Sequence, residues 1–261
     1  MDHSYWQRQT ADKPLFPDLL WSRPENRAHA GKLLIVGGNA HGFAAAAEAY
    51  ALANSAGAGK IRVLLPDALQ KSVGPMFAAG EYAPSTPSGS FAQTALGELL
   101  PMAHWADGVL LAGDLGRNSE TAILIEKFLT KHPGQVTLTK DAIEYITSQP
   151  ALVRERANTL LVLSFSQLQK LAVELKFPIA FTSGMDLLRA VDALHELSGA
   201  FPFAIITRHL DNLLVAIGGQ VSSTPCKVDE RVWRLKKASS AAVWRLQNPS
   251  KPFEALTTAV A

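Results

Sequence analysis

The chain has 261 residues, of which 48% are apolar and 18% are charged, and its mean hydropathy is +0.08. This composition excludes a disordered chain, because enough apolar surface is present to offset the entropy lost on ordering. The length fits one domain with a large core. A formal net charge of +2 gives the whole protein no strong field for nucleic acid or anionic lipid.

The amino-terminal residues and the single cysteine help to predict the cellular compartment of the protein. Residues 1–6 include Asp2 and His3 and contain no apolar segment of the kind found in signal peptides. Cys226 cannot form a disulfide within the chain, and no apolar run approaches the ~18 residues of a membrane span. We therefore expect a cytoplasmic protein with no membrane partner.

The first 30 residues differ in character from the rest. They are polar and are interrupted by Pro14, Pro17 and Pro24, which fix φ and remove backbone donors. We expect residues 1–30 to form an irregular arm and residues 31–261 to form a single domain.

From residue 31 onward, short apolar runs alternate with longer helical patterns, as in βαβ units. The expected strands are residues 33–36, 61–65, 109–112, 136–139, 160–163 and 204–207. The expected helices are residues 43–55, 91–100, 121–130, 167–176 and 185–197, while residues 179–182 fit either a strand or a linker. Short strands without polar alternation are buried on both faces. The first four strands are therefore expected to be parallel neighbours in a three-layer α/β fold with helices on both faces of the sheet.

The carboxy-terminal part adds a different pattern. Residues 213–217 and 220–223 flank Gly218 and Gly219, which predicts an antiparallel hairpin at the sheet edge. Apolar residues at 232, 235, 242, 243 and 246 indicate a helix that ends at Asn248-Pro249, and residues 253–259 indicate a second, short helix.

Two glycine-rich segments each follow an expected strand and precede an expected helix. The first is residues 37–42, with the sequence Gly-Gly-Asn-Ala-His-Gly, and the second is residues 113–118, with the sequence Gly-Asp-Leu-Gly-Arg-Asn. Such a segment offers free N–H groups to an anion, although a tight turn without a ligand explains each equally well. Both emerge at the same edge of a parallel sheet, so we expect them to face one cleft. The spacing of the glycines does not fit the Rossmann pattern.

The sequence contains few indications of a metal site, a catalytic serine or a nucleic-acid-binding surface. The histidines have no paired ligand spacing, so no metal site is predicted. Ser119 and Ser183 are interpreted as helix caps. Between residues 227 and 251, seven basic residues and two tryptophans contrast with two acids. This strip fits either a phosphate-binding surface or a solvated helix face whose tryptophans pack inward, and the second is favoured.

Several residues between positions 23 and 66 share the order and spacing of a known family's first block: Arg23-Pro24, His29, Gly31-Lys32, Val36-Gly37-Gly38-Asn39, Ala49, Ala51, Leu52, Gly57-Ala58-Gly59, Val63 and Pro66. They resemble the start of the YjeF carboxy-terminal domain, whose members are ADP- or ATP-dependent NAD(P)H-hydrate dehydratases of the ribokinase-like superfamily. Residues 106–109 and 113–117 resemble its Gly-Pro-Gly-Leu-Gly region, with Asp114 in place of proline. Residues 139–143 resemble its Asp-Ala-Asp-Ala-Leu segment.

The departures concern the family's reactive groups. Its Thr-Pro-His-Pro-Gly-Glu loop corresponds here to residues 163–167, which contain neither histidine nor acid, and its Lys-Gly becomes Arg208-His209. Its Gly-Thr-Gly-Asp motif supplies an anion hole and a proton-transfer group, yet residues 220–261 contain no glycine. Losing either contribution typically lowers a rate by about 10² to 10⁴.

The resemblance implies a ribokinase-like fold with a cleft formed by residues 37–42, 113–118, 164–167 and 208–212. It implies that ADP or ATP with Mg²⁺ contacts Gly37, Gly38, Asn39, Gly113, Asp114, Leu115, Gly116 and Arg208. The expected function is a divergent dehydratase-like or carbohydrate-kinase-like protein that keeps a nucleotide-binding cleft and has weak or no catalysis. The alternative is a non-catalytic binding or assembly module, and a sugar or vitamin kinase ranks below both. A nucleotide is expected as partner rather than nucleic acid, and homo-oligomerisation is left open.

Overall fold

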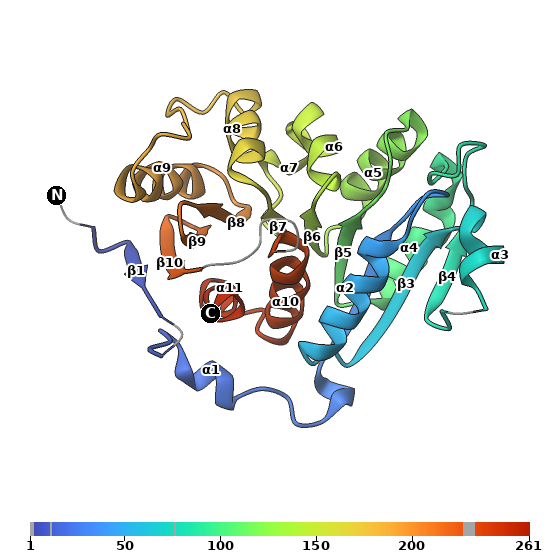
Figure 1. Ribbon diagram of the computed structural model, residues 1–261, viewed down its shortest axis with the longest axis horizontal. Helices are drawn as coiled ribbons and strands as arrows, with labels where there is room; N and C mark the ends of the chain where they lie inside the picture. Colours follow the sequence, from blue (N-terminus) through green and yellow to red (C-terminus); the bar gives the residue numbers. More distant parts are fainter. Residues whose placement is uncertain (1–2, 11, 76, 227–232) are drawn as a thin grey trace.

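The computed structural model describes residues 3–10, 12–75, 77–226 and 233–261. Within them, one sheet of ten strands runs through the molecule in the order β1-β10-β9-β8-β7-β6-β5-β2-β3-β4 (Figure 1). The strands are β1 (Trp6–Arg8), β2 (Lys32–Gly37), β3 (Lys60–Pro66), β4 (Gly80–Ala83), β5 (Gly108–Gly113), β6 (Gln135–Thr139), β7 (Thr159–Val162), β8 (Ala204–His209), β9 (Asn212–Ile217) and β10 (Gln220–Pro225).

Helices connect most of these strands. They are α1 (Pro17–Trp21), α2 (Ala44–Ser55), α3 (Gln70–Val73), α4 (Leu96–Trp105), α5 (Ser119–Lys131), α6 (Ala142–Ser148), α7 (Ala151–Arg154), α8 (Phe165–Glu174), α9 (Leu187–Ala200), α10 (Trp233–Gln247) and α11 (Pro252–Val260). Three short 3-10 turns, at Arg27–His29, Asp67–Leu69 and Gln93–Ala95, complete the described elements.

The four strands predicted to be parallel neighbours are confirmed. β3, β2, β5 and β6 lie side by side, and each adjacent pair is parallel. Their register aligns Leu33 with Ile61 on one side of β2 and with Gly108 on the other. The uniform apolarity that motivated the prediction has the expected cause, because these strands are buried from both sides.

The two faces of the sheet pack against different helices, which makes three layers. Leu34 and Val36 of β2 belong to a core shared with α4, α5, α6, α8 and α9, whereas Leu33 and Ile35 belong to a core shared with α2, α10 and α11 (Figure 1). Successive strand residues point to opposite faces. The three-layer α/β class predicted from the sequence is therefore confirmed.

The hairpin of β9 and β10 is antiparallel, as expected, and β9 is also antiparallel to β8. The outermost strand at this end is β1, which pairs in parallel with β10, aligning Trp6 with Val221. The hairpin thus lies one strand inside the edge. Strand β1 was not predicted, because three residues are too few to show a periodicity.

The segment preceding residue 31 contains further short elements besides β1. Gln9 is buried, and its Nε2 donates hydrogen bonds to Thr224 Oγ1 at 2.8 Å and to Thr257 O at 2.7 Å. Phe16, just before α1, packs edge-on against Phe253 of α11. These contacts fasten the amino-terminal residues to β10 and α11, while the boundary between arm and domain stays a prediction.

Several local expectations need correction. Residues 179–182 form a linker, which is one of the two alternatives left open, whereas β4, α6 and α7 were not predicted. β4 contains a glycine and a glutamate and is largely half-buried, so it lacks the continuous apolar run used to find the others. In the basic strip, Trp233 and Trp244 are buried as expected, but Arg245 is buried too and does not lie on a solvated face.

His132 lies in the turn between α5 and β6, and its ring stacks on Phe128. The side chain is buried, and neither ring nitrogen has a hydrogen-bond partner. Burial lowers the pKa of His132 from 6.5 to about 4, and the positive charge of Arg156 and the neighbouring His104 act in the same direction. The folded state therefore requires the neutral ring.

This requirement predicts an acid-sensitive stability. Between pH 6.5 and pH 4 the unfolded chain binds a proton at His132 that the folded chain does not, so stability is lost as pH falls through this range. By pH 5 the expected loss from this group is about 2 kcal/mol. In urea unfolding measured at pH 7 and pH 5, His132→Phe should reduce the pH-dependent loss, whereas His41→Phe, at an exposed position, should not. An equal loss in His132→Phe and the native protein would contradict the assignment.

Candidate functional site

The two glycine loops meet at the carboxyl ends of β2 and β5. The Gly38 amide donates to Gly113 O at 3.1 Å, and Asn39 Nδ2 donates to Asp114 O at 2.7 Å. Gly113 has a φ of +103°, and a Cβ at that position would lie 2.8 Å from the Cβ of Lys140. Only glycine fits this backbone position without strain. The loops are therefore in direct contact.

Asp114 lies in the loop after β5, and its carboxylate contacts the amino-terminal end of helix α2. Its Oδ2 accepts a hydrogen bond from the Ala45 amide at 2.9 Å, and its Oδ1 forms an ion pair with Lys140 Nζ at 2.9 Å. A helix start attracts negative charge because its first amides lack partners inside the helix. The Asp114 carboxylate therefore lies at the helix start where we expected an anionic ligand to bind.

Asp141 acts on the second loop in the same way. Its Oδ2 accepts hydrogen bonds from the amides of Leu115 at 2.9 Å and Gly116 at 3.2 Å. Burial raises the pKa of the Asp141 carboxyl, while these two amides act in the opposite direction. Internal carboxylates thus accept from two amides of the second loop and from one amide of helix α2, which follows the first loop, and this was not foreseen from the sequence.

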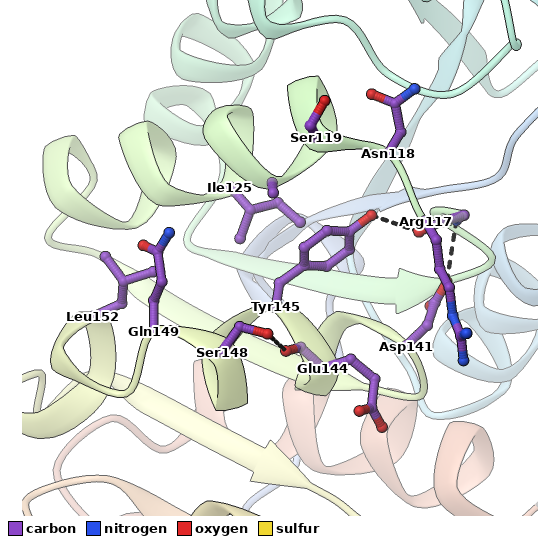
Figure 2. A pocket seen from close by; sticks show the side chains of 12 residues that line it. Arg117, Asn118, Ser119, Ile125, Asp141, Glu144, Tyr145, Ser148, Gln149 and Leu152 are labelled. Atoms are coloured by element: carbon purple, nitrogen blue, oxygen red, sulfur yellow. Dashed lines mark hydrogen bonds between the residues drawn. The ribbon is translucent and has the colours of Figure 1, made fainter. Parts of the chain in front are cut away.

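A cavity of about 430 Å³ opens beside the second loop, between α5 and α6, and we call it the β5–β6 cavity. Figure 2 shows Tyr145 at its centre, with its hydroxyl directed at the loop. That hydroxyl donates to Gly116 O at 2.5 Å, and burial raises the pKa of Tyr145. Ile125 and Leu152 supply apolar walls, and Arg117 also lines the cavity.

A second cavity, of about 460 Å³, lies at the carboxyl ends of β7 and β8 and is named the β7–β8 cavity. It is lined by Ser164, Phe165, Ser166, Ser183, Arg208, His209, Leu210, Trp233 and Arg234. This set combines two guanidinium groups, three hydroxyls and aromatic rings. No carboxylate occurs among the described residues of this lining, and the two guanidinium groups suit a phosphate-bearing ligand.

Its polar side chains are held by identifiable neighbours. Arg234 Nη1 donates to Gln167 Oε1 at 2.9 Å, and burial lowers the pKa of Arg234, with the acids Glu144 and Asp141 opposing this shift. His209 stacks on Phe165 with ring centroids 4.2 Å apart, and its Nε2 donates to Met185 O. Arg208 lies 3.8 Å from Asp211, measured between Nη2 and Oδ1.

The structure brings together most, but not all, of the residues proposed to bind a nucleotide. Gly37, Gly38, Asn39, Gly113, Asp114, Leu115 and Gly116 form one contiguous group, in which Gly116 also lines the β5–β6 cavity. Arg208 lines the β7–β8 cavity instead. Residues 37–42 line neither cavity, so the two loops are neighbours without sharing one of these cavities.

Two capping assignments were wrong. Helix α5 is capped by Asn118, whose Oδ1 accepts from the Glu120 amide, so Ser119 is the first helical residue. Helix α9 is capped by Asp186, and Ser183 lines the β7–β8 cavity. In each case the chain offers several capping residues close together, and their order alone does not decide between them.

Some residues of the cavities were missed in the sequence. Tyr145 gave no motif, and Arg234 was one cation in a long basic strip. Asp229 and Glu230, the two acids of the basic strip, lie outside the described residues. Among described residues, no cluster of three metal-ligating side chains occurs. In the same part of the chain, no helix is both long and apolar enough to cross a membrane.

Solved structures share this arrangement of strands and helices. A ribokinase-like superfamily protein from Enterococcus faecalis V583 matches with a TM-score of 0.72 and 14% identity, covering 99% of this chain and 86% of that one. The chain has the ribokinase-like fold. A protein from Streptococcus mutans matches with a TM-score of 0.65 and 16% identity, covering 91% of this chain and 82% of its own.

The ADP/ATP-dependent NAD(P)H-hydrate dehydratase from Bacillus subtilis, co-crystallized with ATP and Mg²⁺, also matches. Its TM-score is 0.58 at 13% identity, and the match covers 95% of this chain and 86% of the enzyme. No family model and no curated protein sequence matches the chain. At these identities the likeness concerns the fold.

The internal carboxylates of the glycine loops predict a measurable stability effect. Asp114→Asn keeps a side chain that tolerates the positive φ of 56° but removes the charge at the start of α2 and the ion pair with Lys140. We expect a loss of about 1 kcal/mol in the free energy of unfolding. Urea unfolding at pH 7 measures it, with Asp12→Asn at an exposed position as control. Equal stability of the two variants would show that the Asp114 charge does not hold the loop.

Proposed function

We propose that this ribokinase-like protein binds an adenine nucleotide or a related phosphate-bearing small molecule in the β7–β8 cavity, with little or no catalytic turnover. The observation that carries the proposal is the convergence of Arg208 and Arg234 on one cavity, whose described lining includes no acid. Two guanidinium groups offer forked donors to phosphate oxygens. The aromatic rings of Phe165 and Trp233 in the same lining offer apolar surface for a base.

The glycine loops are a poorer location for the phosphates. The Ala45 amide at the start of α2 already donates to Asp114, and the Leu115 and Gly116 amides donate to Asp141. A phosphate would have to displace one of these carboxylates against charge repulsion. The likeness to an enzyme co-crystallized with ATP and Mg²⁺ is consistent with a nucleotide ligand. For the metal, the described part of the β7–β8 cavity lining supplies hydroxyls but no carboxylate. The residues therefore suit the nucleotide better than its Mg²⁺.

Weak turnover follows from the same side chains. A general base must reach the proton that it takes. His209 lines the β7–β8 cavity, but its Nε2 is engaged with Met185 O and its ring is stacked on Phe165. Asp114 is engaged with the Ala45 amide of α2, and Asp141 with the Leu115 amide of the second glycine loop. No described carboxylate in this cavity is placed to act as the base.

Nucleotide binding is tested by thermal shift and calorimetry with ADP, ATP, NAD⁺, NADH and common sugars. Arg208→Met and Arg234→Met should each weaken ADP binding about tenfold or more, because each removes charge-assisted hydrogen bonds to phosphate. Arg189→Met, at an exposed arginine of α9, is the matched control. Nucleotide affinity that is unchanged in both cavity variants would place the ligand elsewhere.

A separate assay addresses catalysis. The protein is supplied with NADH hydrate, ADP or ATP and Mg²⁺, and recovery of NADH absorbance is followed beside an active dehydratase. We expect a rate more than about tenfold below that of the active enzyme, the low end of the loss for a missing proton-transfer group. A rate within tenfold of the control would contradict the proposal.

A second candidate function is a binding or assembly module that uses no nucleotide. It is favoured by the hydrogen bonds that amides of both glycine loops donate within the chain, because these bonds give the loops a structural role. The two candidates differ in one result: the first requires stabilisation by ADP or ATP that depends on Arg208 and Arg234, and the second requires none.

A further inference from the structure

The amino-terminal edge of the sheet, opposite both cavities described above, contains a buried arginine without an acid partner. Arg245 lies in the last turn of α10 and is 4% exposed. Its Nη1 has no hydrogen-bond partner, and its Nη2 has one long contact, to Ala157 O at 3.4 Å. None of the ion pairs among the described residues includes Arg245.

A second guanidinium adds to this charge. Arg156 donates from Nη1 to Asn158 O and Thr159 Oγ1, and from Nη2 to His132 O and Gly134 O, so it ties together the segments that precede β6 and β7. Its hydrogen bonds are therefore satisfied by neutral acceptors, and its charge is not neutralised. Burial lowers the pKa of Arg245 to about 10, and the Arg156 charge acts in the same direction.

A cavity of about 580 Å³ adjoins Arg245, and we call it the Arg245 cavity. Its lining comes from the segments that precede β5, β7 and β8, from the start of β6, from the end of β9 and from the residues between the end of α10 and the start of α11: Asp107, Gln135, Ala157, Asn158, Pro202, Ile217, Arg245, Leu246, Pro249 and Pro252. One acid is present, Asp107, and its Oδ2 accepts a hydrogen bond from the Lys32 amide at 2.8 Å. Most of the remaining wall is apolar.

Burying an uncompensated charge is unfavourable unless a counter-charge or several hydrogen bonds accompany it. The carboxyl end of α10 contributes a favourable dipole to Arg245 but no full charge. We propose that the Arg245 cavity binds a small organic anion, a carboxylate or a phosphate monoester with a compact apolar body. The guanidinium of Arg245 pairs with the anionic group, and the prolines, Ile217 and Leu246 contact the apolar part.

Thermal shift with benzoate and with phenyl phosphate tests the proposal, using sodium chloride at matched ionic strength as reference. The two probes share an apolar ring and differ in the anionic group, so they distinguish a carboxylate from a phosphate monoester. The native protein should gain about 2 °C or more in Tm with at least one probe. No gain with either probe would overturn the proposal.

Two variants locate the effect. Arg245→Met keeps an extended apolar side chain without the charge, and Ala157→Phe places a ring at an exposed position of the cavity lining. Both should abolish the shift, whereas Lys251→Met, which removes an exposed nearby cation outside the lining, should retain it. If Arg245→Met does not fold, Ala157→Phe decides alone. A shift that persists in either folded cavity variant would overturn the proposal.

The site is independent of the proposed nucleotide cavity. Arg208→Met and Arg234→Met should leave the benzoate or phenyl phosphate shift unchanged, and Ala157→Phe should leave ADP binding unchanged. Loss of the probe shift in the Arg208 or Arg234 variant would contradict an anion site at the amino-terminal edge. The two proposals can therefore fail separately.

Discussion

The carboxyl edge of this sheet depends on how the backbone amides after β5 are satisfied. A loop that turns sharply between a buried strand and a helix leaves N–H groups that need acceptors. Asp141 accepts two of them, and Asp114, in the same loop, reaches across to the start of α2. These two carboxylates fix the relative positions of β2, β5, β6 and α2. The glycines around them are required by the close approach of the loops, whether or not a ligand binds there.

Gln167 links this edge of the sheet to the β7–β8 cavity through three hydrogen bonds. Its Nε2 donates to Lys140 O at 2.9 Å and to Glu144 Oε1 at 3.0 Å, and its Oε1 accepts from Arg234 Nη1. One amide thus joins a residue that lines the β5–β6 cavity to a residue that lines the β7–β8 cavity. A glutamate at this position would pair with Arg234 more strongly but would repel Glu144. The neutral amide satisfies both neighbours.

The sequence predicted the part of the fold that depends on burial. The strands β2, β3 and β5 to β10 were located within about two residues, because residues buried on both faces give continuous apolar runs. β1 and β4 were missed because both are short and half-buried, so hydrogen bonding to a neighbour rather than apolarity defines them. The partner of β1 is β10, which is distant in the chain, and β4 is separated from its partner β3 by a 3-10 turn and the short helix α3.

The candidate site was predictable only in outline. The glycine loops were found because glycine has few other reasons to recur after strands, and the structure places them in contact. That Asp114 would turn back to α2 depends on its φ of 56°, which no sequence pattern reports. Arg234 and Arg245 could not be told apart in the basic strip, although one lines a cavity at the carboxyl edge and the other is buried near the opposite edge. The spacing of residues along a helix predicts which residues share a face, but it does not predict which part of the protein packs against that face.

The pairing of β1 with β10 has a consequence for biosynthesis. Gln9, just after β1, bonds to Thr224, 215 residues later in the chain. At roughly 5–20 residues per second, a ribosome needs on the order of 10 to 40 seconds to make the partner after the first strand has emerged. During that interval the nascent amino-terminal segment has no edge to join. The centre of the sheet, whose strands follow one another closely, can form first, and the amino-terminal strand closes the structure last.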